Sequence, residues 1–309
     1  MSGSTRASNT KEVSQRQIET GRMTLFRAQR PWQAVLRFLQ RRPLGAVGAA
    51  IVILMALAAL LAEIIAPFDP LQNDYGAMFN APGATHWLGT DSFGRDVLSR
   101  LLYGSRTALW VGFSSSLFAS TVGAALGVTA AYFGGKVDLL LQRLLDILIS
   151  FPLIVLALVV VALLGSGIWN VIVAIAIPMI PRAALVLRSS SLALRQMLFV
   201  EAALTLGAGH ARVIFSHMLP NVVAPFLIIL TAFLGQAILL EASLSFLGLG
   251  VAEPTAAWGL MLRGAAVDFA ERAPWMALFP GLAISLAVFA FNVFGDSLRD
   301  ALDPKLRVP

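Results

Sequence analysis

The 309-residue sequence has no cysteine, three histidines and few charged residues, and each shortage excludes a kind of chemistry. Without cysteine the chain has neither disulfides nor thiolate chemistry. The histidines, His86, His210 and His217, lie on different segments, and no two have the spacing of metal ligands. Charged residues make up 13% of the chain, against roughly a quarter in an ordinary soluble domain. A protein-built metal site and a soluble globular fold are both disfavoured.

Motifs of nucleotide hydrolysis and of hydrolase catalysis are also missing. The stretch YFGGKV around Lys136 comes nearest to a phosphate-binding loop, but it lacks the first glycine and the Ser or Thr after the lysine. There is no G-x-S-x-G sequence and no membrane-embedded Ser–His or paired-Asp arrangement that would indicate a hydrolase. We therefore expect no catalytic residue, no cofactor and no ATP hydrolysis by this chain alone.

Apolar residues, in contrast, make up 58% of the chain and form long uncharged runs. A helix needs about 20 residues to cross the hydrocarbon core, and unbroken runs of this length favour helices over the alternating strands of a barrel. The sequence predicts an all-α polytopic membrane protein with six transmembrane helices. The expected spans are 44–62, 108–133, 147–164, 168–187, 222–240 and 275–295, the fourth interrupted by Pro178 and Pro181.

Lysine and arginine predict the orientation. Of the 23 such residues, 18 fall on one side of the expected spans and five on the other, so the positive-inside rule places both termini in the cytoplasm. The net charge of +6 is explained by the cationic residues at the cytoplasmic ends of the spans, which contact anionic membrane lipid. No nucleic acid partner is needed to explain it. The five expected outside are Arg95, Arg100, Arg106, Arg263 and Arg272.

Two features of the expected spans allow more than one interpretation. Gly123 and Gly127 belong to a stripe of small residues on the second span, which serves either packing within the chain or a subunit contact or pathway lining. Glu241 lies deep in the fifth span, where charge is costly. It makes either a helix-packing hydrogen bond or a contact at the pathway or a subunit interface.

The outside stretch LGTDSFGRDVLSRLLYG contains an expected helix of its own. Thr90 or Asp91 would cap this helix, which would end near Gly104. Asp96 and Arg100 fall at i and i+4, the spacing of a weak surface pair.

The loop between the fourth and fifth spans is too long for a simple turn. Good helix formers at 192–206 are stopped by Gly207 and Gly209, and a second segment, 211–218, is expected to end before Pro220. Ala202 and Ala203 are small enough to let another surface approach closely, and Gly207 can adopt a left-handed conformation. We interpret the loop as an ordered helix–turn–helix that docks a partner.

The residues of this loop resemble the EAA loop of permease subunits of ATP-binding-cassette (ABC) importers. Glu201-Ala202-Ala203 is followed after four residues by Gly207 and then by Leu219-Pro220. His217 replaces the isoleucine usual at its position, and "HMLPN" is similar to the dipeptide, oligopeptide and nickel branch. The C-type permeases of that branch are also similar at PFDP (67–70), LGTDSFGRDVLSRLLYGSR (88–106), EASLSFLGLG (241–250) and WGLM (258–261).

This resemblance implies a type I ABC importer permease fold in a bacterial or archaeal plasma membrane. The expected domains are a cytoplasmic tail (1–43), a first helix with an extracytoplasmic segment (44–106), an ABC transmembrane type-1 domain (107–299) with its EAA loop at about 189–220, and a C-terminal tail (300–309). The implied partners are a second homologous permease, two ABC ATPase subunits and an extracytoplasmic solute-binding protein. The implied solute is a di- or oligopeptide or a related small molecule.

The resemblance also suggests roles for individual residues. Glu201 would contact the ATPase or order its own loop, and the rest of the coupling set would allow close packing, shape the turn or fix the exit into the fifth span. That set is Glu201, Ala202, Ala203, Gly207, His217, Leu219 and Pro220. The candidates for an external gate or binding-protein contact, with a capped structural helix as the alternative, are Asp91, Gly94, Arg95, Asp96 and Arg100.

Two rival functions remain. A stand-alone secondary transporter would need ligands for a coupling ion in its spans, and a membrane-embedded enzyme would need a catalytic constellation. The few membrane charges disfavour the first, and the missing motifs disfavour the second.

Overall fold

A computed structural model of the chain describes residues 42–266, 269 and 271–302. Within these residues the secondary structure is helical, apart from one isolated antiparallel bridge between Thr90 and Asp96. The expected N-terminal tail, residues 1–43, lies almost entirely outside the described residues, as does most of the expected C-terminal tail.

Five helices of the described chain are long and apolar enough to cross a membrane, and a bent pair of helices forms a sixth candidate. The prediction of an all-α membrane protein with six spans is thereby confirmed. The five are α3 (Pro43–Leu60), α5 (Val97–Phe133), α8 (Ile168–Arg195), the continuous run through α10 and α11 from His210 to Phe246, and α13 (Trp275–Leu302).

The predicted third span, 147–164, is wrong as a single helix. Helix α6 (Gly135–Ile149) already begins in the expected turn, and α7 (Leu153–Leu164) follows a break of three residues at an angle of 90°. The break contains Pro152, which has no backbone N–H to donate and disfavours a helical conformation in Phe151 before it. The apolar run therefore folds as two helices that change direction.

Two other predicted helix ends are also wrong, because both helices run further than expected. The fourth span was expected to pass Pro178 and Pro181 but to end at Leu187. Helix α8 passes through both Pro178 and Pro181 and continues to Arg195. Helix α5 passes through Gly104, where a separate short helix was expected to end. A tightly packed neighbour explains the second case, since a Cβ on Gly104 would lie 2.5 Å from the indole of Trp258.

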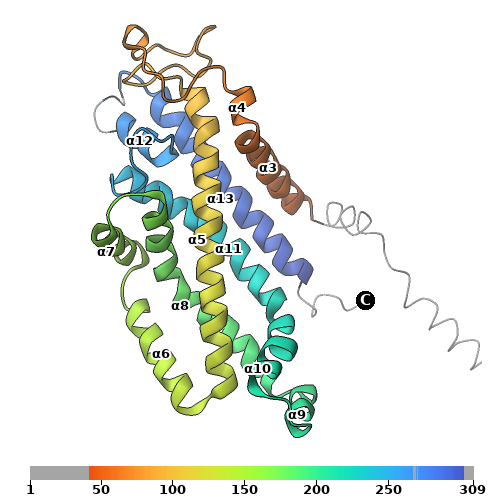
Figure 1. The fold of residues 1–309 in the computed structure, drawn as a ribbon. Helices are drawn as coiled ribbons and strands as arrows, with labels where there is room; N and C mark the ends of the chain where they lie inside the picture. The colour runs from red at the N-terminus through yellow and green to blue at the C-terminus, as the bar shows by residue number, and fades with distance from the viewer. Residues whose placement is uncertain (1–41, 267–268, 270, 303–309) are drawn as a thin grey trace, which may run out of the picture. The chain divides into compact units, whose positions relative to one another are not determined.

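Two connecting regions lie at opposite ends of the helices (Figure 1). The 66–96 segment, which joins α4 (Ala62–Ile65) to α5, contains a 3₁₀ turn at Tyr75–Ala77. The α9 loop, residues 196–212, contains α9 (Leu198–Thr205) and α10 (His210–Arg212) and lies at the other end. A short helix, α12 (Trp258–Ala266), lies between α11 (Leu219–Phe246) and α13 along the chain.

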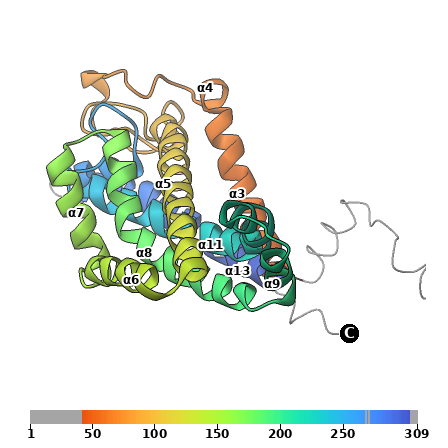
Figure 2. The ribbon, with the colours of Figure 1, turned by 60° about the horizontal axis from the view of Figure 1, so that its bottom comes forward.

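Helix α5 lies beside α8 and α11 (Figures 1 and 2). Its glycines face α8 closely: a Cβ on Gly123 would lie 2.9 Å from the backbone nitrogen of Ala184, and a Cβ on Gly127 would lie 2.5 Å from the Ala184 carbonyl oxygen. Gly112 likewise meets Ile238 of α11. This contact favours packing within the chain for Gly123 and Gly127, the first of the two alternatives, and a subunit contact or pathway lining stays a prediction.

Gly127→Ala should destabilise the protein, because the new methyl group would press on the backbone of α8, which cannot move away as a side chain can. Overpacking of this kind costs about 1–3 kcal/mol. We expect a clearly lower thermal midpoint for the purified chain in mild detergent. Gly264→Ala is the matched control, because a Cβ there meets no atom within 4 Å. Equal midpoints for the two variants would contradict the close contact.

Candidate functional site

The α9 loop begins with a break in the helix rather than with the expected continuous helix over 192–206. Helix α8 ends at Arg195, and α9 starts at Leu198 after the extended residue Met197. After the turn at Gly207 and Gly209, α10 and a π-helical segment, Val213–Met218, continue directly into α11. The predicted helix–turn–helix is present, but its second part does not stop before Pro220.

Gly207 ends α9 in the left-handed conformation that the sequence predicted. Its φ is +82°, its N–H donates to the carbonyl of Leu204, and the N–H of Ala208 donates to the carbonyl of Ala203, each at 3.0 Å. This pair of bonds is the Schellman motif, which satisfies the last carbonyls of a helix. The spacing between Ala203 and Gly207 thus reflects one helix cap, in which Ala203 supplies a carbonyl acceptor and Gly207 supplies the left-handed residue.

Buried apolar side chains hold the α9 loop on the spans. Val200, Val213 and Met218 have no exposed surface and belong to the main apolar core. Ala203 and Ala208, the residues joined by the cap, also pack against this core. Ala203 is therefore partly covered by the protein's own core, whereas Ala202 is exposed, and contact of either alanine with a partner stays a prediction.

The opposite side of α9 is open and apolar. Leu198, Ala202 and Leu206 follow one another at intervals of four residues, so they lie on one face of the helix. Leu198 is 81% exposed and Leu206 is 88% exposed. Glu201 is exposed beside them, and its backbone carbonyl accepts a hydrogen bond from Thr205 at 2.9 Å. The loop presents an apolar ridge, residues 198, 202 and 206, with one carboxylate at its edge.

The remaining members of the coupling set lie where the loop enters α11. The carbonyl of His217 accepts a hydrogen bond from the side-chain amide of Asn221 at 2.7 Å. Leu219 packs against the main core, and Pro220 is exposed in the first turn of α11. Within this continuous helical run Pro220 has no backbone N–H to donate, so one helical hydrogen bond is missing. The π-helical turn before it shows where the backbone hydrogen-bond pattern changes.

The five predicted gate residues, four in the 66–96 segment and Arg100 in the first turn of α5, are all buried. The Asp91 carboxylate accepts from the backbone N–H groups of Phe93 and Arg95, at 2.8 and 3.0 Å, and from Nε of Arg95 at 2.7 Å. Arg95 also donates to Glu253 at 3.0 Å, which joins this segment to the loop after α11. Such charge-assisted bonds hold a turn firmly.

Asp96, and not Thr90 or Asp91, caps α5. Its carboxylate accepts from the N–H and the hydroxyl of Ser99, each at 2.8 Å, and lies 3.0 Å from Nδ1 of His86. The predicted pair between Asp96 and Arg100 is wrong. Arg100 instead donates to the carbonyl of Pro70 at 3.1 Å and has its Nε 3.7 Å from the Asp91 carboxylate. The cap turns the Asp96 side chain away from Arg100.

Gly94 has a φ of +72°, and a Cβ there would overlap the carbonyl of Asp74. All five gate candidates are thus part of a compact, tightly packed region at the start of α5, residues 91–100. With Arg100 only 1% exposed, any effect of these side chains on a partner acts through the shape of the segment. Their role at a gate or binding-protein contact stays a prediction.

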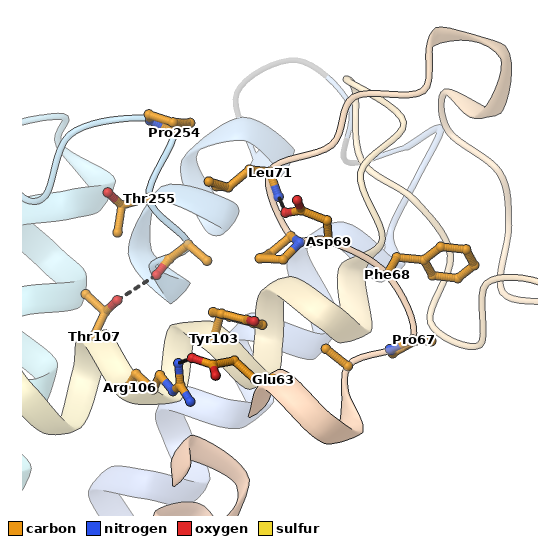
Figure 3. A pocket seen from close by; sticks show the side chains of 13 residues that line it. Glu63, Pro67, Phe68, Asp69, Leu71, Tyr103, Arg106, Thr107, Pro254 and Thr255 are labelled. Carbon is orange, nitrogen blue, oxygen red and sulfur yellow. Dashed lines mark hydrogen bonds and ion pairs between the residues drawn. The ribbon is translucent and has the colours of Figure 1, made fainter. Parts of the chain in front are cut away.

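A cavity of about 720 Å³ opens beside this compact region, between α4, the first turns of α5 and residues 254–256 (Figure 3). Arg106 in its wall donates to Glu63 at 2.8 Å and to the carbonyl oxygens of Ala59 and Leu60. Since these groups belong to α3 and α4, the arginine ties the end of the first span to α5.

Glu241 is 1% exposed within α11 and accepts a hydrogen bond from the hydroxyl of Ser245 at 2.7 Å, one turn further along. The same hydroxyl accepts from the backbone N–H of Val251 at 3.3 Å. This arrangement favours the helix-packing alternative for Glu241, and a pathway role stays a prediction.

Sequence reasoning missed two side-chain contacts between residues far apart in the chain. The hydroxyl of Tyr132 lies 2.7 Å from Nδ1 of His210, and Arg188 forms two hydrogen bonds, of 2.6 and 2.5 Å, with the Asp138 carboxylate. The first pair is 78 residues apart and the second is 50 residues apart, so no local spacing indicates them. In the described residues no group of three His, Cys, Asp or Glu side chains could hold a metal ion.

Comparison with known proteins identifies the family. Residues 123–308 match the family described as binding-protein-dependent transport system inner membrane component. The chain belongs to this family of transport permeases. Residues 30–82 also match the N-terminal transmembrane domain of oligopeptide transport permease C.

Similar permeases cover nearly the whole chain. The dipeptide transport system permease protein DppC of Alkalihalophilus pseudofirmus is 40% identical over 282 residues, which cover 91% of this chain and 92% of the relative. Glutathione transport system permease proteins GsiD are 42% identical in Pectobacterium atrosepticum, over 90% of this chain and 92% of the relative, and 44% identical in Escherichia coli, over 90% and 91%. The permease is therefore a multi-pass inner-membrane transport subunit and not an enzyme. Its family implies an ATPase and a solute-binding protein as partners.

Gly207→Ala should weaken the α9 loop, because an alanine at positive φ is strained by roughly 1 kcal/mol even where space is free. We expect faster protease cleavage between α8 and α11 and lower transport activity. Gly209→Ala is the matched control: the φ of Gly209 is −66°, and both positions have open space around a new Cβ. Identical cleavage rates for the two variants would contradict the role of the cap.

Asp96→Ala should loosen the 66–96 segment, because it removes the cap of α5 and leaves His86 without its partner. The expected cost is about 2 kcal/mol. It is measured as a lower thermal midpoint and as faster proteolysis of the segment. Asp69→Ala serves as control, since this exposed carboxylate accepts, among the described residues, only the N–H of Leu71, at 2.8 Å. A midpoint for Asp96→Ala as high as that of the control would show that the cap is dispensable.

Proposed function

We propose that this permease forms half of the translocation pathway of an ATP-driven importer for di- or oligopeptides or a related small solute, and that the α9 loop couples it to the ATPases. The complete transporter contains a second homologous permease, two ATPase subunits and a solute-binding protein. The observation that carries the proposal is the apolar ridge on α9, which is rigidly anchored and otherwise uncovered.

The anchoring and the exposure of α9 support a docking role together. A short helix with Leu198 and Leu206 more than 80% exposed stabilises little of its own fold on that side. The buried Val200 on its other side holds it in place. A partner that covers residues 198, 202 and 206 gains apolar burial without first having to order the helix.

The orientation follows from the same proposal. The α9 loop faces the cytoplasm, where ATP is available, and both termini lie on that side, in agreement with the excess of Lys and Arg there. The 66–96 segment then faces outward, on the side of the solute-binding protein. Its buried ion pairs give this side a fixed shape for a partner to recognise.

The peptide class rests on the relatives, which are named as dipeptide and glutathione permeases. Both solutes are short peptides with free carboxylates. Liposomes that contain the complete transporter and its loaded binding protein should accumulate a labelled dipeptide or glutathione when ATP is present.

Ala202→Trp should reduce binding of the ATPase subunits, because the bulky ring would stand on the middle of the apolar ridge while the inward face of α9 is unchanged. We expect at least about a tenfold loss of ATPase co-purified with the tagged permease, the equivalent of about 1.4 kcal/mol. Ala84→Trp is the control. This alanine is also exposed but lies in the 66–96 segment, at the other end of the helices.

Full ATPase recovery with Ala202→Trp would refute the docking surface. Solute uptake by the permease without any ATPase would refute the importer and favour the secondary-transporter alternative.

A further inference from the structure

We infer that Tyr132 and His210 form a latch that passes movement of the α9 loop to helix α5. The inference rests on the proposed function, in which nucleotide-dependent movement of the ATPases pulls on α9. It adds positioning residues that act through the loop and touch neither solute nor ATPase.

The latch joins the start of α10 to the last turns of α5. The hydroxyl of Tyr132 and Nδ1 of His210 are hydrogen-bonded at 2.7 Å, and the two rings meet edge to face with centroids 5.6 Å apart. The ring of Phe133 also lies against His210, at 5.8 Å. Because Tyr132 is only 6% exposed and belongs to the main core, its hydroxyl is held in a fixed place.

A second contact ties the other end of the α9 loop to the same turn of α5. Arg195, the last residue of α8, donates from Nη1 to the carbonyl of Ala131 at 3.2 Å. The guanidinium lies against Gly134, where a Cβ would come within 2.8 Å of Nη1. A cation at the carbonyl end of a helix is also favoured by the helix dipole. Adjacent residues of α5, Ala131 and Tyr132, therefore hold the chain immediately before and shortly after α9.

Helix α5 can carry such a movement over a long distance. Its 37 residues form one helix, about 55 Å long at 1.5 Å per residue. Its first turn is joined to the 66–96 segment by the hydrogen bonds between Asp96 and Ser99. The α9 loop and the 66–96 segment are thus attached to the two ends of a single helix, α5. A rigid element with both sites fixed to it is the kind of physical connection that coupling requires.

The test measures coupling rather than stability. Tyr132→Phe keeps the ring and its packing but removes the hydroxyl. In liposomes with the whole transporter, we expect ATP hydrolysis stimulated by the loaded binding protein to continue, while solute transported per ATP falls about fivefold, the factor that one ordinary hydrogen bond supplies.

Tyr103→Phe is the matched control on the same helix. The Tyr103 hydroxyl has no hydrogen-bond partner in the part of the chain that the structure describes, although its ring lies beside Arg106. His210→Leu should resemble Tyr132→Phe, whereas His210→Asn should retain most of the coupling, because the amide places a polar atom near the position of Nδ1. The double variant Tyr132→Phe with His210→Leu should be no worse than either single variant, which identifies the pair itself.

Normal transport per ATP in Tyr132→Phe, or additive losses in the double variant, would overturn the latch. Loss of bound ATPase from Tyr132→Phe would also overturn it, because the hydroxyl would then act on docking. If wild-type permease recovers no ATPase, the proposed function fails and the latch fails with it. Recovery of the ATPase with normal coupling in Tyr132→Phe refutes the latch alone.

Discussion

The close contact between α5 and α8 is the constraint on which the rest of the structure depends. Gly123 and Gly127 remove the side chains that would hold the two backbones apart, so the two helices come into close contact there. In hydrocarbon, where lipid tails are as apolar as side chains, such close packing and not apolar burial drives helices together. The contact fixes the place where α8 ends and the α9 loop begins, and also the place where α5 ends beside it.

The two ends of α5 are held by different kinds of interaction. At the 66–96 segment, the Asp91 and Asp96 carboxylates accept hydrogen bonds from neighbouring side chains and backbone N–H groups, which gives a compact shape to a stretch with little regular structure. At the α9 loop, apolar side chains such as Val200 fasten a short helix while its other face stays open. A segment of fixed shape and an uncovered helix suit recognition on one side and docking on the other.

Local sequence reasoning predicted the helices well where one interaction decides the outcome. Long uncharged runs predicted helices, because only helices and closed barrels satisfy the backbone in lipid and barrel strands are short and alternate apolar with polar residues. Gly207 was correctly expected to be left-handed, since ending a helix is a local problem. The reasoning failed where neighbours decide: α5 continues through Gly104, and Asp96 bonds Ser99 and His86 in place of Arg100.

The sequence by itself determined the membrane environment, the helical class, the family resemblance and the residues of the α9 loop, because each depends on composition or on short spacings. Only the tertiary structure decided which face of α9 is open, that Ala203 packs inward, and that Tyr132 meets His210 across 78 positions of the chain. Contacts of this kind depend on how α5 and α8 pack against each other, and no periodicity along the chain records where two helices end side by side.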